Sequence, residues 1–203
     1  MGTEYLDHWR KRMARGPLEA GTVQNGNDTW EFIEPLLPEG FEPKTILEYG
    51  CAYGRMMRHL HMRWPDARLY GVDLSGEALD HLIKHWPDSP PPNLFNQNVP
   101  PADIRVDLIF TCTVLQHITD DNVLKAVALG FRKILNPGGY LILFENINWG
   151  PGQGGAHMRE FAASDYMGLW PEMRWNDCGK FMHVLEAHEL MIGRSPAKGK
   201  GGL

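Results

Sequence analysis

The feature that most constrains the fold is a change of pattern within one short stretch, ILEYGCAYGRMMRHL, at residues 46–60. It begins as an apolar run, passes through Glu48 and two glycines at positions 50 and 54, and continues with apolar residues at helical spacing. An apolar run bounded by glycine is typical of a buried strand, and the spacing of Met56, Met57 and Leu60 is typical of one helix face. The stretch therefore predicts a strand, a sharp turn and a helix.

The same alternation continues along the chain and predicts a parallel sheet. Further strands are expected at residues 67–73, 93–98, 106–112 and 140–147, separated by helices that begin near Ser75 and Thr119. The run FMHVLEAHELMIGR (181–194) predicts two final strands with a turn near 186–188. We therefore expect an α/β fold: a doubly wound, mostly parallel seven-stranded sheet with a C-terminal antiparallel hairpin and helices on both faces.

Length and composition predict one domain. The 203 residues are 43% hydrophobic, enough for a single core spanning residues 1–194. Helical patterns at 4–15 and 29–37 predict an N-terminal cap over residues 1–38, and the glycine- and lysine-rich residues 195–203 predict a disordered tail. The sequence has no apolar run of membrane-spanning length and no signal-peptide pattern, so we expect a cytoplasmic protein without membrane contact.

Charge and cysteine content argue against several classes of protein. The net charge of −5 argues against a nucleic-acid partner, which usually requires a broad basic face. Cys51, Cys112 and Cys178 are odd in number and far apart, which favours reduced thiols over disulfides or a zinc site. We therefore expect no metal, and the sequence does not determine the oligomeric state.

Acidic residues accompany the first two strand ends. Glu48 precedes the glycine turn after the first strand, and Asp73 ends the second strand. Ligands of open α/β sheets bind outside the carboxyl ends of the strands, where a carboxylate after the second strand can reach two ribose hydroxyls. Short glycine motifs also occur in ordinary turns, but the strand, helix and Asp73 together favour a nucleoside site.

At these positions the chain resembles the class I S-adenosylmethionine-dependent methyltransferases of small-molecule type, clearly over residues 45–147. The family's acidic residue and G-x-G-x-G motif correspond to Glu48, Gly50, Ala52 and Gly54, with Ala52 in place of the middle glycine. A methyl group is compatible with this turn if φ is negative at Ala52. LIFTCTVLQHI and LNPGGYLILFE resemble the family's fourth strand and its passage into the fifth.

The resemblance implies S-adenosyl-L-methionine as the cofactor. Glu48 and the loop would hold its methionine part, Asp73 its ribose and Asn98 its adenine amino group, although an ordinary turn is an equally good explanation of Asn98. Neighbours of these positions complete the expected cofactor-binding set, which comprises Glu48, Gly50, Cys51, Ala52, Gly54, Asp73, Leu74, Asn98, Val99 and Cys112.

The resemblance also implies methyl transfer, for which the protein mainly aligns an acceptor and excludes water. The catalytic candidates, chosen by their place after strands, are His117, His157 and Glu145. Two further hypotheses are that Arg159 binds an acidic acceptor and that Trp149, Tyr166 and Trp170 line an apolar pocket. A solvated surface position for Arg159 and core packing for the aromatic residues are favoured over these roles.

The acceptor is the least constrained part of the prediction. The chain reads Thr111-Cys112-Thr113-Val114 where related enzymes acting on nucleobase or amide nitrogen carry N/D-P-P-Y/F. A small molecule methylated on oxygen or nitrogen, with oxygen favoured, is expected, and a protein or RNA acceptor is the alternative. Two other classes remain open: an NAD-dependent oxidoreductase, against which the missing G-x-G-x-x-G spacing argues, and a non-catalytic cofactor-binding module.

Overall fold

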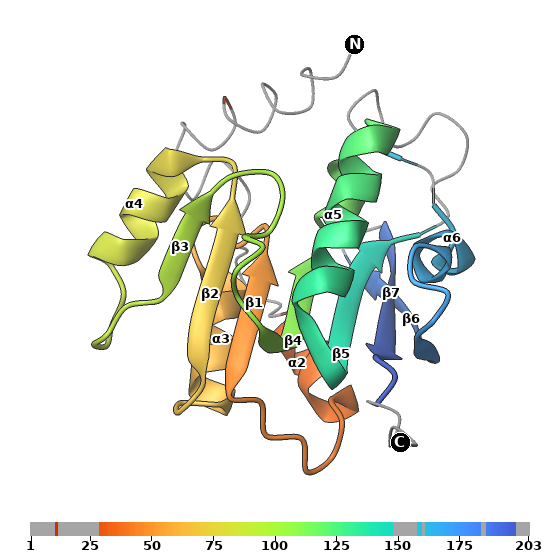
Figure 1. The fold of residues 1–203 in the computed structure, drawn as a ribbon, viewed down its shortest axis with the longest axis horizontal. Helices are drawn as coiled ribbons and strands as arrows, with labels where there is room; N and C mark the ends of the chain where they lie inside the picture. Colours follow the sequence, from red (N-terminus) through yellow and green to blue (C-terminus); the bar gives the residue numbers. More distant parts are fainter. Residues whose placement is uncertain (1–10, 12–28, 148–157, 160, 184–185, 198–203) are drawn as a thin grey trace, which may run out of the picture.

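The computed structural model describes residue 11, residues 29–147, 158–159, 161–183 and 186–197. The chain runs through these elements in the order α2 (Trp30–Ile33), η1 (Glu34–Leu36), β1 (Thr45–Tyr49), α3 (Arg55–Arg63), β2 (Arg68–Asp73), α4 (Gly76–Lys84), β3 (Asn93–Asn96), β4 (Val106–Cys112), η2 (Leu115–His117), α5 (Asp121–Ile134), β5 (Leu135–Asn146), α6 (Ala163–Gly168), β6 (Arg174–His183) and β7 (Glu186–Arg194) (Figure 1).

The strands form one seven-stranded sheet in the order β3-β2-β1-β4-β5-β7-β6. Strands β1 to β5 pair in parallel, whereas β7 is antiparallel to both β5 and β6. The strand order reverses between β1 and β4, so their carboxyl ends flank a topological switch point, where α/β sheets bind ligands. The predicted fold class, including the C-terminal hairpin, is confirmed.

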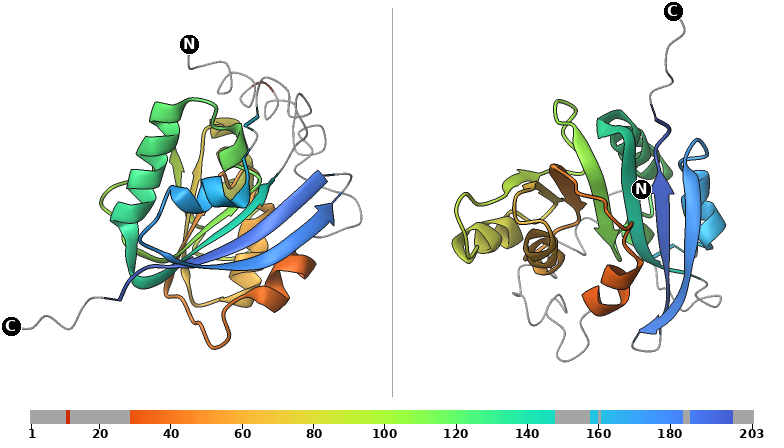
Figure 2. Two further views of the ribbon diagram at one scale, coloured as in Figure 1. Left: turned by 90° about the vertical axis from the view of Figure 1, so that its right-hand side faces the viewer. Right: turned by 90° about the horizontal axis from the view of Figure 1, so that it is seen from below.

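Helices cover both faces of the sheet. Leu47 and Tyr49 of β1 point into a core cluster shared with α5 and α6, whereas Ile46 points into a second cluster shared with α2, α3 and α4. This alternation follows from the two-residue period of a strand. Figure 1 shows α5 in front of the sheet and α3 behind it, and Figure 2 shows the same separation from the side.

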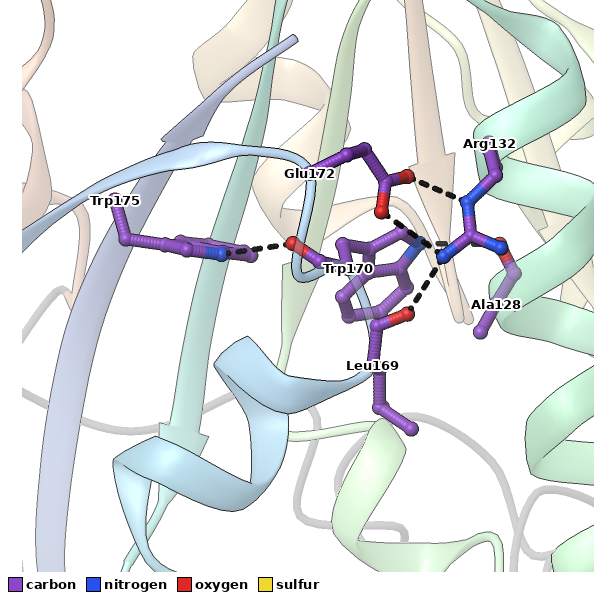
Figure 3. Close-up of polar contacts among 6 residues, drawn as sticks. All are labelled: Ala128, Arg132, Leu169, Trp170, Glu172 and Trp175. Carbon is purple, nitrogen blue, oxygen red and sulfur yellow. Dashed lines mark hydrogen bonds and ion pairs between the residues drawn. The ribbon is translucent and has the colours of Figure 1, made fainter.

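Helix α6 and the chain after it are fastened to α5 by aromatic and charged contacts (Figure 3). Trp170 is fully buried, stacks on Phe131 of α5 and donates a hydrogen bond from Nε1 to the carbonyl of Ala128 (3.0 Å). Arg132 pairs through two nitrogens with the carboxylate of Glu172. Tyr166 is also fully buried, so core packing is confirmed for Trp170 and Tyr166, while Trp149 lies outside the described residues.

Two local predictions were wrong by a few residues. The cap of α5 is Asp120 instead of Thr119, because the Asp120 carboxylate accepts hydrogen bonds from the N–H groups of Asn122 (2.8 Å) and Val123 (3.2 Å). The C-terminal strands are longer than expected: β6 begins at Arg174 and ends at His183, and residues 186–188, where the turn was expected, belong to β7. Sequence periodicity is weak in strands whose two faces differ little in polarity.

The ends of the chain were expected to form a cap and a tail. The described part of the cap, α2 and η1, packs on the α3 face, where Trp30 stacks on His59 at 5.5 Å between ring centroids. At the other end, Ser195 donates its backbone N–H to Gly139, and the Pro196 carbonyl accepts from Gly138, so ordered backbone continues past residue 194. Within the described ranges, no helix has the length and apolar character needed to cross a bilayer.

Candidate functional site

The turn between β1 and α3 depends on glycine at two positions. Gly50 and Gly54 both have φ of +77°, the left-handed region that glycine adopts without strain. The backbone N–H groups of Gly50 and Cys51 both donate to the carbonyl of Val72 at the end of β2, at 2.7 and 3.1 Å. A Cβ on Gly50 would lie 2.3 Å from Val114 Cγ2, so Gly50 also allows the chain after β4 to approach the turn closely.

Ala52, which replaces the middle glycine, also has a positive φ of 44°. The condition that φ is negative at this position is therefore wrong, and the alanine carries backbone strain of about 1–2 kcal/mol. Its N–H donates to Asp73 Oδ2 at 2.8 Å, and the N–H of Ser75 donates to Asp73 Oδ1 at 2.9 Å. Asp73 thus ties the β1 turn to the β2 turn, and this tie holds Ala52 in its strained conformation.

Glu48, one residue before the end of β1, is a buried carboxyl just before the turn. Burial raises its pKa well above the ordinary value, the nearby Asp73 raises it further, and Arg55 and a hydrogen bond from the Met57 backbone oppose the rise. Among the described residues its buried Oε2 has no hydrogen-bond partner. A buried polar atom without a partner is costly, so Glu48 has one oxygen available for a donor from a ligand.

The Asn98 side chain presents a second buried acceptor, Oδ1, for which the described residues supply no partner. Its backbone carbonyl accepts a hydrogen bond from the Tyr49 hydroxyl at 2.7 Å, which fixes this loop against β1. An amide oxygen at this place matches the acceptor expected for an adenine amino group.

The other expected cofactor residues lie at the same edge of the sheet but differ in burial. The thiol of Cys51 is buried, and burial first, then the charges of Asp73 and Glu48, raise its pKa well above the ordinary value. Burial raises the pKa of Cys112 to about 12, so both cysteines are thiols near neutral pH. Leu74 and Val99 are half-buried.

These observations fit S-adenosylmethionine. The unpartnered oxygens of Glu48 and Asn98 can accept from its amino groups, and the Asp73 carboxylate can accept a further hydrogen bond from a ribose hydroxyl. The left-handed turn at Gly50 and Gly54 leaves the backbone open to close approach. The donors and acceptors of the site therefore suit a nucleoside that carries an ammonium group.

Glu145 lies at the carboxyl end of β5 and is fully buried. Its Oε1 accepts from the Thr111 hydroxyl at 2.7 Å, and its Oε2 accepts from the N–H groups of Val114 and Leu115 at 2.9 and 3.1 Å. Burial raises its pKa to about 7, against the lowering effect of these donors. The carboxylate therefore connects β5 to the segment that follows β4.

The solvated surface position that was favoured for Arg159 is wrong, and binding of an acidic acceptor by Arg159 stays a prediction. Its guanidinium donates to the carbonyls of Ile118 and Thr119 and pairs with Asp121 Oδ1 at 2.7 Å, and only 16% of the side chain is exposed. Its backbone N–H donates to the carbonyl of Gln116 at 2.7 Å. Arg159 thus fastens the chain after β5 to the connection between β4 and α5.

The histidine candidates are placed unequally. His117 ends η2 at the carboxyl edge, half-buried, with Nε2 3.3 Å from Nε2 of Gln116. Gln116 is buried and accepts from the Asn146 N–H through Oε1 at 2.8 Å, so it joins η2 to β5. His157 lies outside the described residues, and the roles of His117, His157 and Glu145 stay predictions.

Val114 is the residue of this site that the sequence did not indicate. Its side chain covers Gly50, from which it is separated by more than sixty positions in the chain. A valine in an apolar run carries no local signal of such a contact, because the contact depends on the pairing of β4 with β1.

Comparison with known proteins agrees with this geometry. Residues 47–141 match a family model described as a methyltransferase domain. The malonyl-[acyl-carrier protein] O-methyltransferase of Xylella fastidiosa is 36% identical over 104 residues, 49% of this chain and 34% of that protein. The trans-aconitate 2-methyltransferase of Pseudomonas aeruginosa is 31% identical over 124 residues, 55% of this chain and 37% of that protein. The matched part of this chain thus spans little more than a third of each relative's length.

Solved structures share the fold. The N-methyltransferase NodS of Bradyrhizobium japonicum, in complex with S-adenosylhomocysteine, has a TM-score of 0.74 at 17% identity and covers 95% of this chain and 98% of its own. The magnesium protoporphyrin IX methyltransferase of Synechocystis, with bound S-adenosylmethionine, has a TM-score of 0.70 at 12% identity and covers 95% and 97%. Residues 47–141 thus resemble a methyltransferase domain, the chain shares the fold of S-adenosylmethionine-dependent methyltransferases, and S-adenosylmethionine is the expected cofactor.

Proposed function

We propose that this protein transfers a methyl group from S-adenosylmethionine to an oxygen or nitrogen of a small-molecule acceptor. The observation that carries the proposal is the turn at Glu48–Gly54, which combines left-handed glycines, a buried carboxyl oxygen without a partner among the described residues and the adjacent Asp73. The methyltransferase-domain match over residues 47–141 supports it independently.

Each residue of the site has a defined task in this proposal. Glu48 accepts hydrogen bonds from the ammonium of the methionine part, Asp73 orients the ribose, and Asn98 accepts from the adenine amino group. S-adenosylmethionine supplies a methyl group that is already activated on sulfur, so the protein's contribution is alignment and exclusion of water. Val114, which follows β4, packs against the turn at Gly50, and Gln116 of η2 joins this segment to β5.

A carboxylate oxygen is the acceptor that we propose to test first. Two relatives carry names that specify malonyl-[acyl-carrier protein] and trans-aconitate, and both of these compounds contain carboxylates. A carboxylate is deprotonated near neutral pH and needs no general base, whereas a hydroxyl or ammonium acceptor must lose a proton. Replacement of His117 by Ala therefore separates these acceptors, since the loss of turnover is large only where His117 removes a proton.

Binding of S-adenosylhomocysteine, measured by calorimetry, tests the cofactor assignment. We expect S-adenosylhomocysteine to bind and NAD not to bind, and Asp73→Asn to weaken S-adenosylhomocysteine binding by about 1–3 kcal/mol because a charged hydrogen-bond partner of the ribose is lost. Asparagine is chosen because its side-chain oxygen can still accept one of the two backbone N–H groups, of Ala52 and Ser75, that Asp73 binds. Tighter binding of NAD than of S-adenosylhomocysteine would sink the assignment in favour of an oxidoreductase.

Transfer of a radiolabelled methyl group tests the acceptor. The panel comprises malonyl thioesters, trans-aconitate and other small carboxylic acids, small amines, and protein and RNA fractions. We expect the label in a product that alkali hydrolyses, as it does a methyl ester. Label retained after alkali in an amine, or found only in protein or RNA, would replace the carboxylate proposal with the corresponding alternative.

A further inference from the structure

The inference concerns the segment Thr113–Leu115 after β4, in which each residue donates a backbone hydrogen bond to β5. Oε2 of Glu145 accepts the N–H groups of Val114 and Leu115, while Oε1 accepts the Thr111 hydroxyl just before them. The N–H of Thr113 donates to the carbonyl of Phe144 at 2.7 Å. Thr113 itself has φ of +56°, a conformation that persists only when surrounding contacts enforce it.

The same segment meets the cofactor turn through one side chain. Val114 lies directly over Gly50, close enough that a Cβ there would approach its Cγ2 to 2.3 Å and its Cγ1 to 2.7 Å. Gly50 is in turn fixed from β2, because its N–H donates to the carbonyl of Val72. A continuous set of contacts therefore runs from the Glu145 carboxylate through the Val114 backbone and side chain to the cofactor turn.

We infer that Glu145 is a positioning residue for the cofactor turn: it fixes the backbone of Val114 so that the valine side chain closes over Gly50. This inference rests on the proposed function, because it assigns the turn to the cofactor. It replaces direct catalysis by Glu145, whose two oxygens are both occupied by donors from the chain and whose side chain is buried. Loss of the carboxylate leaves two backbone N–H groups without their acceptor, and the segment must move to regain one.

Asp107 provides a matched control at the opposite edge of the sheet. Its Oδ2 also accepts two adjacent backbone N–H groups, those of Lys44 (2.8 Å) and Thr45 (3.1 Å), together with the Thr45 hydroxyl (3.1 Å). It lies at the beginning of β4, whereas the cofactor turn lies at the carboxyl ends. Removal of either carboxylate costs a comparable number of hydrogen bonds, but only Glu145 acts on Val114.

The experiment measures S-adenosylhomocysteine affinity and thermal unfolding of the full chain for Glu145→Ala, Glu145→Gln, Asp107→Ala, Val114→Ala and the double variant Glu145→Ala/Val114→Ala. We expect Glu145→Ala to weaken affinity about tenfold and Val114→Ala by a similar factor. Glu145→Gln should retain affinity within about threefold, because the amide oxygen accepts the two N–H groups and the amide nitrogen donates to Thr111. Asp107→Ala should lower the unfolding temperature and leave affinity unchanged.

The double variant decides the route of the effect. If Glu145 acts through Val114, the double variant should bind S-adenosylhomocysteine about as weakly as Val114→Ala alone, because the effects of coupled residues do not add. Wild-type affinity in folded Glu145→Ala, or full additivity in the double variant, would overturn the inference. If Glu145→Ala does not fold, unchanged affinity in Val114→Ala overturns it instead. Absence of S-adenosylhomocysteine binding by the wild type would overturn the proposed function and, with it, this inference.

Discussion

At each end of the sheet a carboxylate accepts hydrogen bonds from neighbouring backbone N–H groups, which we call a carboxylate clamp. The pKa values of the two clamps are shifted in opposite directions. Asp107 at the amino edge and Glu145 at the carboxyl edge each accept two neighbouring backbone N–H groups and a threonine hydroxyl. Burial tends to raise the pKa of Asp107, but hydrogen bonds from Asn136, Lys44 and Thr45 hold it below the ordinary value. For Glu145 the effect of burial is larger than that of the hydrogen bonds, and the pKa rises to about 7.

The difference teaches that hydrogen-bond count alone does not determine the charge state. Asp107 is half-buried and remains partly hydrated, so its donors add to solvation by water. Glu145 has no exposed surface, and its donors only partly replace the water that it lost. The clamp at the amino edge thus favours the ionised form of Asp107, whereas Glu145 at the carboxyl edge titrates near neutral pH.

The largest expected effect comes from replacing Gly50 at the carboxyl edge by alanine, with Gly40 at the amino edge as the comparison. Gly50→Ala introduces both a left-handed alanine and a 2.3 Å contact with Val114, so we expect a loss of about 2–4 kcal/mol in unfolding free energy and loss of S-adenosylhomocysteine binding. Gly40, before β1, has a similar φ of +68° and nothing within 4 Å of a built Cβ. Gly40→Ala should therefore cost only about 1 kcal/mol. Chemical denaturation measures both.

A second substitution at Val114 separates clash from backbone strain. The double variant Gly50→Ala/Val114→Ala lacks the two valine methyl groups that would clash with a Cβ at position 50. It should regain the stability lost to this clash, but not the stability lost to the left-handed backbone. Equal destabilisation by Gly50→Ala and Gly40→Ala would mean that close packing of Val114 has no energetic weight at this turn.

The next effect is a pH dependence of opposite sign at the two clamps. Glu145 has a native pKa of about 7 against an ordinary 4.5, so its contribution to stability is fully present below about pH 4.5 and is lost as pH rises through 7. The size is on the order of 3 kcal/mol. Asp107 has a lowered pKa, so its contribution is present above its ordinary pKa of 3.8 and is lost as pH falls through the native value.

Neutral amides measure these contributions. The unfolding free energy of Glu145→Gln minus that of the wild type should increase between pH 4.5 and 8. The corresponding difference for Asp107→Asn should change only in acid, where the wild type loses the stability contributed by ionised Asp107. Subtraction removes the titration of all other groups that behave alike in both proteins. A pH-independent difference for Glu145→Gln would contradict a raised pKa at Glu145.

The contrast between edges also explains what could be predicted from the sequence. The turn between β1 and α3 was predictable because Glu48, Gly50 and Gly54 lie within seven positions and the two glycines each meet a local backbone demand. Glu145 was recognised only as an acid at the end of a strand, and its partners lie about thirty positions earlier. Such side-chain to backbone contacts depend on strand pairing and leave no periodic signal.

Neighbouring residues of equivalent chemistry set another limit. Thr119 and Asp120 are both competent helix caps, and only the structure shows that the Asp120 carboxylate reaches the free N–H groups. Arg159 was read as a surface or acceptor-binding residue, because its carbonyl partners, Ile118 and Thr119, belong to a distant segment. Burial of a charged side chain against backbone carbonyls cannot be inferred from residue type.

The smallest expected effect sharpens the comparison within the site edge itself. Ala52 has φ of +44°, and its N–H is held by Asp73 Oδ2, so it is strained in a turn where the family motif has glycine. Ala52→Gly removes about 1–2 kcal/mol of left-handed strain but adds about 0.5–1 kcal/mol of unfolded-state entropy, which leaves a net gain of about 0.5–1 kcal/mol. Ala126→Gly, in the interior of α5, should instead destabilise by about 1 kcal/mol. Denaturant unfolding of the two variants decides the matter: if Ala52→Gly loses as much stability as Ala126→Gly, the positive φ at residue 52 costs nothing, and the tie from Asp73 then holds an unstrained turn.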